Sequence, residues 1–271
     1  MAERGRSGVS KNKHDFSELW PIAERLAEAA RVETLKHFRA FDLTADSKAA
    51  DFDPVTIADR NAEAAMRAIL QDLRPNDGIL GEEFGITEGT SGLTWVLDPI
   101  DGTRGYISGT PTWGVLIALS DAKGPILGVI DQPYIGERFL GGGGRAEVTG
   151  PQGTNRLGVR RTIDLNAATL FTTFPEVGNA SEGAAFRRVA EQVRLTRYGC
   201  DCYAYALLAA GQIDLVIEAE LAAYDIQAPI AVIEAAGGIV TDWEGGSVHQ
   251  GGRAIAAATP ELHKAAMAVL T

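Results

Sequence analysis

The chain has 271 residues, of which 45% are hydrophobic, enough for one large domain or two modest ones with a sizeable core. It carries 36 acidic against 25 basic residues, a formal net charge of -11, so we expect no nucleic-acid partner and no anionic membrane surface. No apolar run reaches membrane-spanning length, and the basic start of the chain lacks the apolar segment of a secretory signal. The only cysteines, Cys200 and Cys202, are too close together for an ordinary structural disulfide, so we expect a cytoplasmic protein.

The N-terminal half, which we place at residues 15–155, is predicted to begin with two helices. Residues 1–14 are polar and without periodicity, so we expect them to form a mobile tail. Apolar residues recur at helical spacing over residues 19–39, which predicts the first helix. Thr56 is a candidate N-cap for the second helix, which should stop near Arg74 because a proline follows.

A pattern of short strands bounded by glycine and proline begins at Leu93 and predicts a partly antiparallel sheet. Its predicted strands are residues 94–97, 114–119, 126–130 and 138–140. Glycine-rich runs at 141–144 and 150–153 mark turns.

The C-terminal half, residues 156–271, is predicted to alternate strands with helices. The expected strands are residues 169–173 and 213–218, and the expected helices are 182–193, 203–210, 226–236 and 260–270. The element order therefore predicts an α+β protein whose two halves meet near residue 155.

One apolar strand is predicted to end in two carboxylates, in the run Trp95-Val96-Leu97-Asp98-Pro99-Ile100-Asp101-Gly102-Thr103. The end of a strand is a rigid place for metal ligands. The proline fixes the turn between the two acids, and Gly102 lets backbone N–H groups face a phosphate. Taken alone, the run could also be a turn rich in aspartate and glycine.

Three other acids could join this pair. Glu82 lies in a Gly-Glu-Glu run behind a strand-like apolar pair, although two exposed glutamates are usually a solvated surface. Asp225 precedes a helix, where simple capping explains it equally well. Asp59 is the weakest by itself, because an acid in the first turn of a helix is ordinary.

Together these segments resemble the inositol-monophosphatase family of metal-dependent phosphatases over nearly the whole chain. The likeness is carried by residues 53–60, 81–83, 95–103, 224–225 and 235–238, which match in order and spacing. The family usually has tryptophan before the last aspartate, so Tyr224 is a departure that bears on packing rather than on the metal site. The resemblance implies a layered α/β/α/β/α sandwich, with its acidic site where the halves join, and a homodimer.

The resemblance further implies two Mg²⁺ ions that share the carboxylate of Asp98, and a third, weaker ion or its waters near Asp59. The ligands would be Glu82, Asp98 and the carbonyl oxygen of Ile100 for the first ion, and Asp98, Asp101 and Asp225 for the second. Carboxylates about 4 Å apart repel by roughly 4 kcal/mol at an effective dielectric of 20, and hard divalent cations relieve that repulsion.

Two such metals suit in-line phosphoryl transfer to water without a covalent enzyme intermediate. By resemblance, Thr103 and Asp59 would orient the attacking water, with Glu82 beside them as a further catalytic acid. Backbone N–H groups of Gly102 and Thr103 would hold phosphate oxygens, and Asp225 would also contact the substrate.

The substrate is expected to be a small phosphate monoester, and residues 195–205 look like the histidinol-phosphatase branch of the family. Inositol-specific members usually carry a small residue where this chain has Asp201. Histidinol phosphate has an ammonium and an imidazole that Asp201 and Glu218 could bind through charge-assisted hydrogen bonds. Inositol phosphate, a sugar phosphate or a nucleotide remains an alternative, and a silent phosphate-binding regulatory module is an alternative of another class.

The two cysteines invite a metal or redox interpretation. Without a second Cys/His pair in suitable spacing they are a poor zinc site, so we expect Cys200 and Cys202 to pack beside the pocket.

Overall fold

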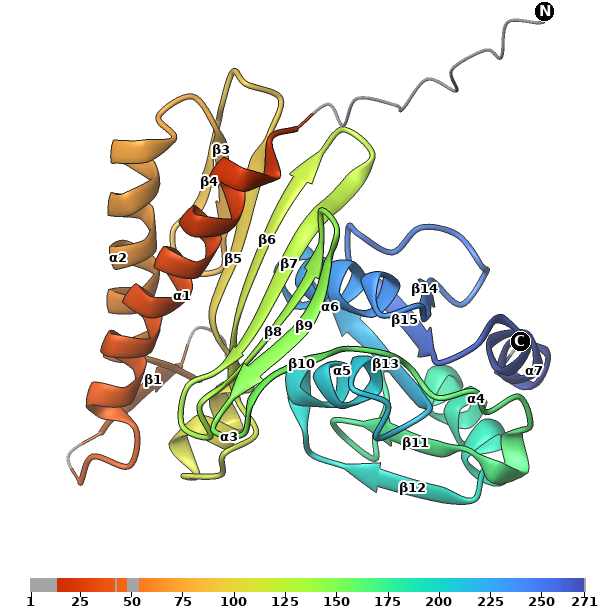
Figure 1. The fold of residues 1–271 in the computed structure, drawn as a ribbon. Helices are drawn as coiled ribbons and strands as arrows, with labels where there is room; N and C mark the ends of the chain where they lie inside the picture. Colours follow the sequence, from red (N-terminus) through yellow and green to blue (C-terminus); the bar gives the residue numbers. More distant parts are fainter. Residues whose placement is uncertain (1–13, 42, 48–53, 271) are drawn as a thin grey trace, which may run out of the picture.

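The computed structural model describes residues 14–41, 43–47 and 54–270 (Figure 1). The tail predicted for residues 1–14 lies outside this part except for His14, and so does Asp53 of the family-like run. None of the helices in the described ranges is long and apolar enough to cross a membrane.

Two long helices, α1 (Phe16–His37) and α2 (Ile57–Leu73), begin at side-chain caps. The Asp15 carboxylate accepts the N–H of Ser17, and the Thr56 hydroxyl accepts the N–H of Ala58, as expected for N-caps. The cap and the end predicted for α2 are confirmed, and α1 ends two residues before the expected position. A two-stranded ribbon of β1 (Ala45–Ser47) and β2 (Pro54–Thr56) leads into α2.

An eight-stranded sheet follows, in the order β10-β9-β8-β7-β6-β5-β3-β4, antiparallel except where β3 lies parallel to β5. Its strands are β3 (Gly78–Gly81), β4 (Gly85–Thr87), β5 (Thr94–Asp101), β6 (Gly114–Asp121), β7 (Gly124–Gln132), β8 (Glu137–Gly142), β9 (Arg145–Gly150) and β10 (Gly153–Arg156). The four strands predicted here are confirmed as parts of β5 to β8. The short strands β4, β9 and β10 were not predicted.

A five-stranded mixed sheet has the order β12-β11-β13-β15-β14. Its strands are β11 (Thr169–Thr172), β12 (Leu195–Tyr198), β13 (Leu215–Leu221), β14 (Ile239–Thr241) and β15 (Gly252–Ala257). The remaining helices are α3 (Thr103–Ile107), η1 (Leu165–Ala167), α4 (Ala180–Ala190), α5 (Asp201–Ala209), α6 (Ala223–Ala235) and α7 (Pro260–Leu270). The four helices and two strands predicted for this half are confirmed to within a few residues, whereas β12, β14 and β15 were missed.

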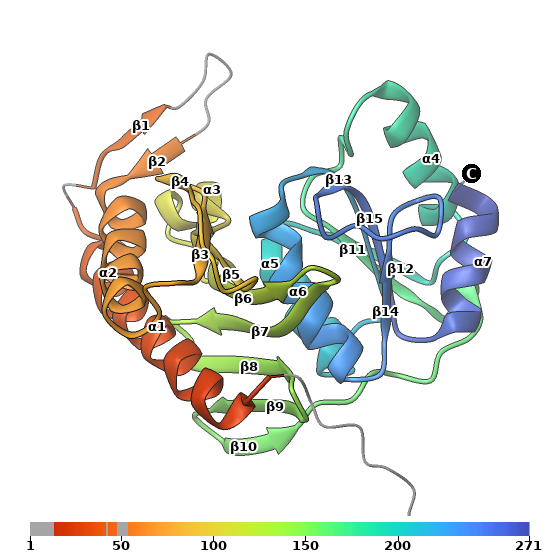
Figure 2. The same cartoon turned by 90° about the horizontal axis from the view of Figure 1, so that it is seen from above.

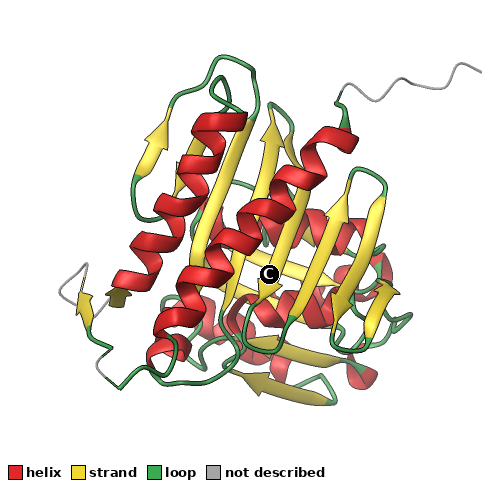
Figure 3. Cartoon of the chain, turned by 60° about the vertical axis from the view of Figure 1, so that its left-hand side comes forward, coloured by secondary structure: helices red, strands yellow, loops and turns green. Residues whose placement is uncertain are grey.

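These elements stack in five layers: α1 with α2, the large sheet, α5 with α6, the small sheet, and α4 with α7 (Figures 2 and 3). The large sheet is therefore covered on both faces. On β5, Trp95 and Leu97 pack with the α1–α2 layer, while Val96 packs with the α5–α6 layer. Burial on both faces explains why such a strand reads as a continuous apolar run. The predicted layered α+β fold is confirmed.

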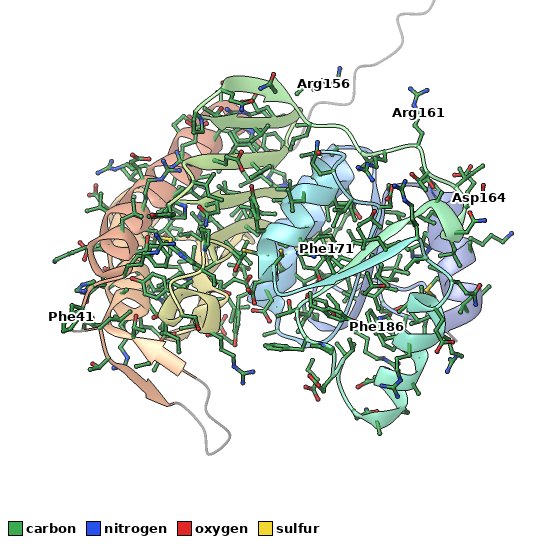
Figure 4. The ribbon with its side chains drawn as sticks, turned by 90° about the horizontal axis from the view of Figure 1, so that it is seen from below. Phe41, Arg156, Arg161, Asp164, Phe171 and Phe186 are labelled. Atoms are coloured by element: carbon green, nitrogen blue, oxygen red, sulfur yellow. The ribbon has the colours of Figure 1, made fainter. Side chains whose placement is uncertain are left out.

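The small sheet is likewise buried on two sides. Phe171 packs in the core between the sheets, whereas Phe186 packs under the outer helices α4 and α7. Figure 4 shows Arg156, at the end of β10, and Arg161, in the segment that joins the two sheets, extending outward. The two sheets and the α5–α6 layer between them bring the carboxyl end of β5 close to the first turns of α5 and α6.

Candidate active site

The end of β5 carries Asp98 and Asp101, and an irregularity in the strand turns both toward one site. In a regular strand, residues three apart point to opposite faces. The pairing of β5 with β6 shifts register between Asp98 and Asp101, as at a β-bulge. Oδ1 of Asp98 accepts the N–H of Ile100 at 3.0 Å, which fixes the turn around the proline.

Gly102 and Thr103 continue the chain into α3. Gly102 has a φ of 84°, in the left-handed region that favours glycine, and a Cβ there would lie 2.8 Å from Cγ of Asp201. The Thr103 hydroxyl donates to the carbonyl of Ile100 at 3.0 Å. The backbone of this turn therefore lies directly against Asp201, which comes from the other half of the chain.

Asp225 reaches the same site from the first turn of α6. Its Oδ2 accepts the N–H of Ala222 at 2.7 Å, so it serves as part of a helix cap. Carboxylate oxygens of Asp98, Asp101 and Asp225 nevertheless lie within 4.8 Å of one another. Glu82 lines the same cavity as Asp98, and its charge acts on Asp98. Acids from β5, α6 and the β3–β4 turn thus converge on one place.

This convergence is electrostatically costly. Burial raises the pKa of Asp98 well above its usual value, and the neighbouring acids raise it further, Glu82 most. Burial also raises the pKa of Asp101, followed by the charges of Asp201 and Asp225, although the Cys202 N–H that donates to it at 2.5 Å acts in the opposite direction. A divalent cation would relieve this repulsion, and an all-oxygen donor set suits Mg²⁺. The residues present therefore fit the metal that the resemblance implies.

Asp59 lies behind this cluster. It is 1% exposed, and its Oδ2 accepts hydrogen bonds from the backbone N–H and hydroxyl of Thr56 at 2.8 and 2.6 Å. Burial raises the pKa of Asp59 to about 6, with smaller contributions from Glu82 and Glu83. It is not among the residues that line the cavity, so the structure places it beside Glu82 rather than facing solvent.

Two adjoining cavities meet at the acids. The larger, about 540 Å³, is lined by Glu82, Asp98, Ile100, Asp101 and Asp225, with Gly102 and Thr103 beside them. The smaller, about 260 Å³, extends toward β13. Both cavities are lined by Asp101, Phe174, Glu176, Asp201, Glu220 and Asp225. A ligand held at the metal-ligand cluster would therefore extend its other end into the smaller cavity.

Asp201 and Glu218 supply charge to the smaller cavity. Burial raises the pKa of Asp201 to about 7, helped by the charge of Glu218 and opposed by Arg104. Glu218 accepts from the Thr173 N–H at 3.0 Å, from its hydroxyl at 2.5 Å, and from the Tyr205 hydroxyl at 2.8 Å. Burial raises the pKa of Glu218, although these donors lower it in part. Glu218 is thus fixed by the protein itself.

Sequence reasoning missed Glu176 and Glu220, which add carboxylates to the shared rim. Glu220 lies within the register shift of β13, between Glu218 and Leu221, and has a φ of 63°. The signal that could have found it is the spacing Glu218-Ala219-Glu220 at a strand end, where alternate side chains share a face.

Cys202 lines the smaller cavity and is buried, while Cys200 is partly buried. The two thiols are not joined in a disulfide. Burial raises the pKa of both thiols, which disfavours a reactive thiolate.

The site and the fold together define a class of protein. Residues 15–271 match the model of the inositol monophosphatase family, and the chain belongs to that family. The resemblance drawn from the sequence is confirmed, and the chain is a phosphatase of a metal-dependent family that acts on phosphate monoesters.

Among its relatives, the bifunctional phosphatase IMPL2 (chloroplastic) of Arabidopsis thaliana is 44% identical over 228 residues, which cover 83% of this chain and 64% of that protein. A histidinol-phosphatase of Streptomyces coelicolor is 35% identical, over 92% of this chain and 95% of that one. A solved inositol monophosphatase from Zymomonas mobilis superposes with a TM-score of 0.82 at 36% identity, covering 95% and 99% of the two chains. These relatives carry different substrate names.

Proposed function

We propose that this phosphatase hydrolyses histidinol phosphate to histidinol and inorganic phosphate, with Mg²⁺ as its metal. The observation that carries the proposal is the position of Asp201, which lies against Gly102 and lines both cavities. An ester whose phosphate binds at the metal-ligand cluster would therefore place its alcohol half beside the half-buried carboxylate of Asp201.

The metal ligands proposed from the sequence are the acids that converge on the larger cavity. Asp98, Asp101 and Asp225 would hold one Mg²⁺, and Glu82, Asp98 and the Ile100 carbonyl a second. When bound, the ions would activate water and stabilise the charge of the phosphoryl group and the departing alkoxide. A third, weaker ion or its waters would lie near Asp59.

The chain's own groups would orient the reaction. The Thr103 hydroxyl, which donates to the Ile100 carbonyl, is placed to accept a hydrogen bond from the attacking water. Asp59, whose pKa is raised to about 6 and which has Glu82 nearby, would accept a proton from the water as it attacks. The N–H groups of Gly102 and Thr103 would bind phosphate oxygens.

The alcohol half would be recognised by charge. Histidinol phosphate presents an ammonium and an imidazole, and Asp201 and Glu218 would bind them, with the rim acids Glu176 and Glu220 adding negative potential. An uncharged polyol would offer Asp201 no cation beyond Arg104, so it would forgo the charge-assisted hydrogen bond that histidinol phosphate makes. The name of the Streptomyces coelicolor relative, histidinol-phosphatase, agrees with this choice.

The second candidate substrate is inositol phosphate, which the similarity to the Zymomonas mobilis structure favours. By family resemblance, the proposal also includes a homodimer, and the cysteine usage of the sequence adds a cytoplasmic location.

Phosphate release from a panel of esters, with and without chelator, tests the proposal. Histidinol phosphate should be turned over faster than inositol phosphate, sugar phosphates and nucleotides, and chelator should abolish release. Equal or faster turnover of inositol phosphate would overturn the substrate assignment. Absence of any Mg²⁺-stimulated release would point instead to a silent phosphate-binding module.

A further inference from the structure

Glu63, on the second turn of α2, is a carboxylate held in the interior of the protein. Its exposed fraction is 0%. It accepts hydrogen bonds from two consecutive backbone N–H groups, those of Glu83 at 2.7 Å and Phe84 at 3.2 Å, and from Nε of Arg67 at 2.7 Å. A buried charge is tolerated only when it is paired and hydrogen-bonded, and these donors meet that condition.

The same carboxylate shapes the segment that carries Glu82. A Cβ at Gly81 would overlap the Glu63 carboxylate, so only glycine permits this close approach. The N–H of Glu82 donates to the carbonyl of Leu97 on β5 at 3.2 Å. The backbone is therefore held immediately before Glu82, at Glu82 and immediately after it, and from this segment Glu82 lines the larger cavity.

Arg67 extends this support across the β3–β4 turn. Its Nη1 donates to the Thr87 hydroxyl at 2.9 Å, and its Nη2 donates to the carbonyl of Gly85. The Glu63–Arg67 pair is neutral overall, so it braces the turn without adding to the repulsion among the acids of the cavity.

We propose that Glu63 is a positioning residue that fixes Glu82 for divalent-cation binding. The inference rests on the proposed function, in which Glu82 is a metal ligand. Glu82 and Asp98 line the same cavity, and the charge of Glu82 acts on Asp98 and on Asp59, which lies one helical turn before Glu63. Because Asp59 and Glu82 repel each other as like charges, the support that α2 gives comes through Glu63 and acts on the backbone that follows Glu82. Removing such an indirect support of a metal ligand typically weakens metal affinity roughly 10- to 100-fold.

The test is Glu63→Gln, which keeps the size of the side chain but loses the charge opposite Arg67 and one acceptor for the two N–H groups. The Kd for Mg²⁺, measured by calorimetric titration of the metal-stripped full chain, should rise roughly 10- to 100-fold. Turnover should recover as the Mg²⁺ concentration is raised, which a merely structural defect would not show.

Asp77→Asn is the matched control. Asp77 is also a buried acid of this strand region, bonded to Nε of Arg74 at 2.7 Å and to Nε1 of Trp95 at 3.0 Å, but it precedes β3 at the opposite end from Glu82. Its loss should lower thermal stability and leave the Kd for Mg²⁺ unchanged.

Arg67→Lys provides a second variant in case Glu63→Gln does not fold. Lysine keeps a charge opposite Glu63 but cannot reach Gly85 and Thr87 together, so the Kd should rise roughly 3- to 10-fold. The proposal is overturned if the folded variants have the same Kd for Mg²⁺ as the unmodified chain. It is also overturned if their Kd is no higher than that of Asp77→Asn, because Glu63 would then not position Glu82. If the unmodified chain binds no Mg²⁺, the proposed function fails as well. The titration of the unmodified chain therefore distinguishes that failure from a failure of the Glu63 proposal alone.

Discussion

The two cavities differ in how the protein holds their carboxylates. At the metal-ligand cluster, Asp98 accepts the N–H of Ile100 and Asp225 accepts that of Ala222, so these two acids are fixed by backbone within three residues, whereas Asp101 accepts the N–H of Cys202 from the other half. At the alcohol-half cavity, Asp201 and Glu220 have φ values of 44° and 63°. They are two of the three non-glycine residues with left-handed backbone in the described ranges.

Strained backbone persists only where the surrounding fold holds it, and it tends to mark functional positions. The comparison therefore separates a metal-ligand cluster in which Asp98 and Asp225 have unstrained, locally fixed positions from a substrate region in which Asp201 and Glu220 are held in strained backbone by the surrounding fold. Turnover should be lost when the metal-ligand cluster is altered, and the preference among substrates should change when the substrate region is altered.

The largest effect is expected for Asp98→Asn, which removes the charge shared by the two proposed metal sites. Turnover should fall by roughly 10²- to 10³-fold or more, as expected when a group that organises transition-state charge is lost. The metal-free variant should be at least as stable as the metal-free parent, because one repelling carboxylate is gone. Thermal unfolding with and without Mg²⁺, together with phosphate release, measures both. Near-normal turnover would refute the assignment.

Asp201→Ala should change substrate preference rather than the chemistry. Losing a charge-assisted hydrogen bond of about 1.5–3 kcal/mol should raise KM for histidinol phosphate roughly 10- to 100-fold. KM for an uncharged-alcohol ester should rise much less. Steady-state kinetics on both esters decides, and equal effects on the two would mean that Asp201 has no part in recognising the cation.

Glu220→Gly would sharpen the comparison, because it removes a rim carboxylate and the strain together. A left-handed backbone costs a non-glycine residue roughly 1–2 kcal/mol, while glycine gives back about 0.5–1 kcal/mol through the freedom of the unfolded chain. The free energy of unfolding should therefore rise by up to about 1 kcal/mol, and kcat/KM for histidinol phosphate should fall by roughly 3- to 10-fold.

Glu176→Gln is the matched control for that variant, since it removes a second rim charge without changing the backbone strain. It should lower kcat/KM for histidinol phosphate without raising stability, as chemical denaturation would show. A gain in stability for both variants would mean that charge repulsion, not strain, is what Glu220 contributes.

The sequence predicted the locally encoded features best. The Thr56 cap and the run from Trp95 to Thr103 are short motifs whose residues act on their own neighbours, so one sequence suffices to find them. The strands β12 and β14 were missed because they are short, and β15 because its form depends on pairing with distant partners, β13 and β14. The position of Glu63 was missed for a related reason, since its carboxylate binds backbone about 20 residues away and its only local signal is the helical spacing from Asp59.

The smallest effect is expected in the pH dependence of the metal-free protein. The pKa of Asp59 is about 6 in the folded chain against an ordinary value of 3.8, so between these values the folded state binds more protons than the unfolded state. The free energy of unfolding should therefore fall as pH rises from about 4 to about 6, and Asp59→Asn should make that fall shallower. Urea unfolding in chelator at pH 4, 5 and 7 measures the slope. If the slope of the free energy of unfolding against pH is unchanged in Asp59→Asn, the titrating groups are other buried acids. Asp59 would then not have its proposed role as a proton acceptor near neutral pH.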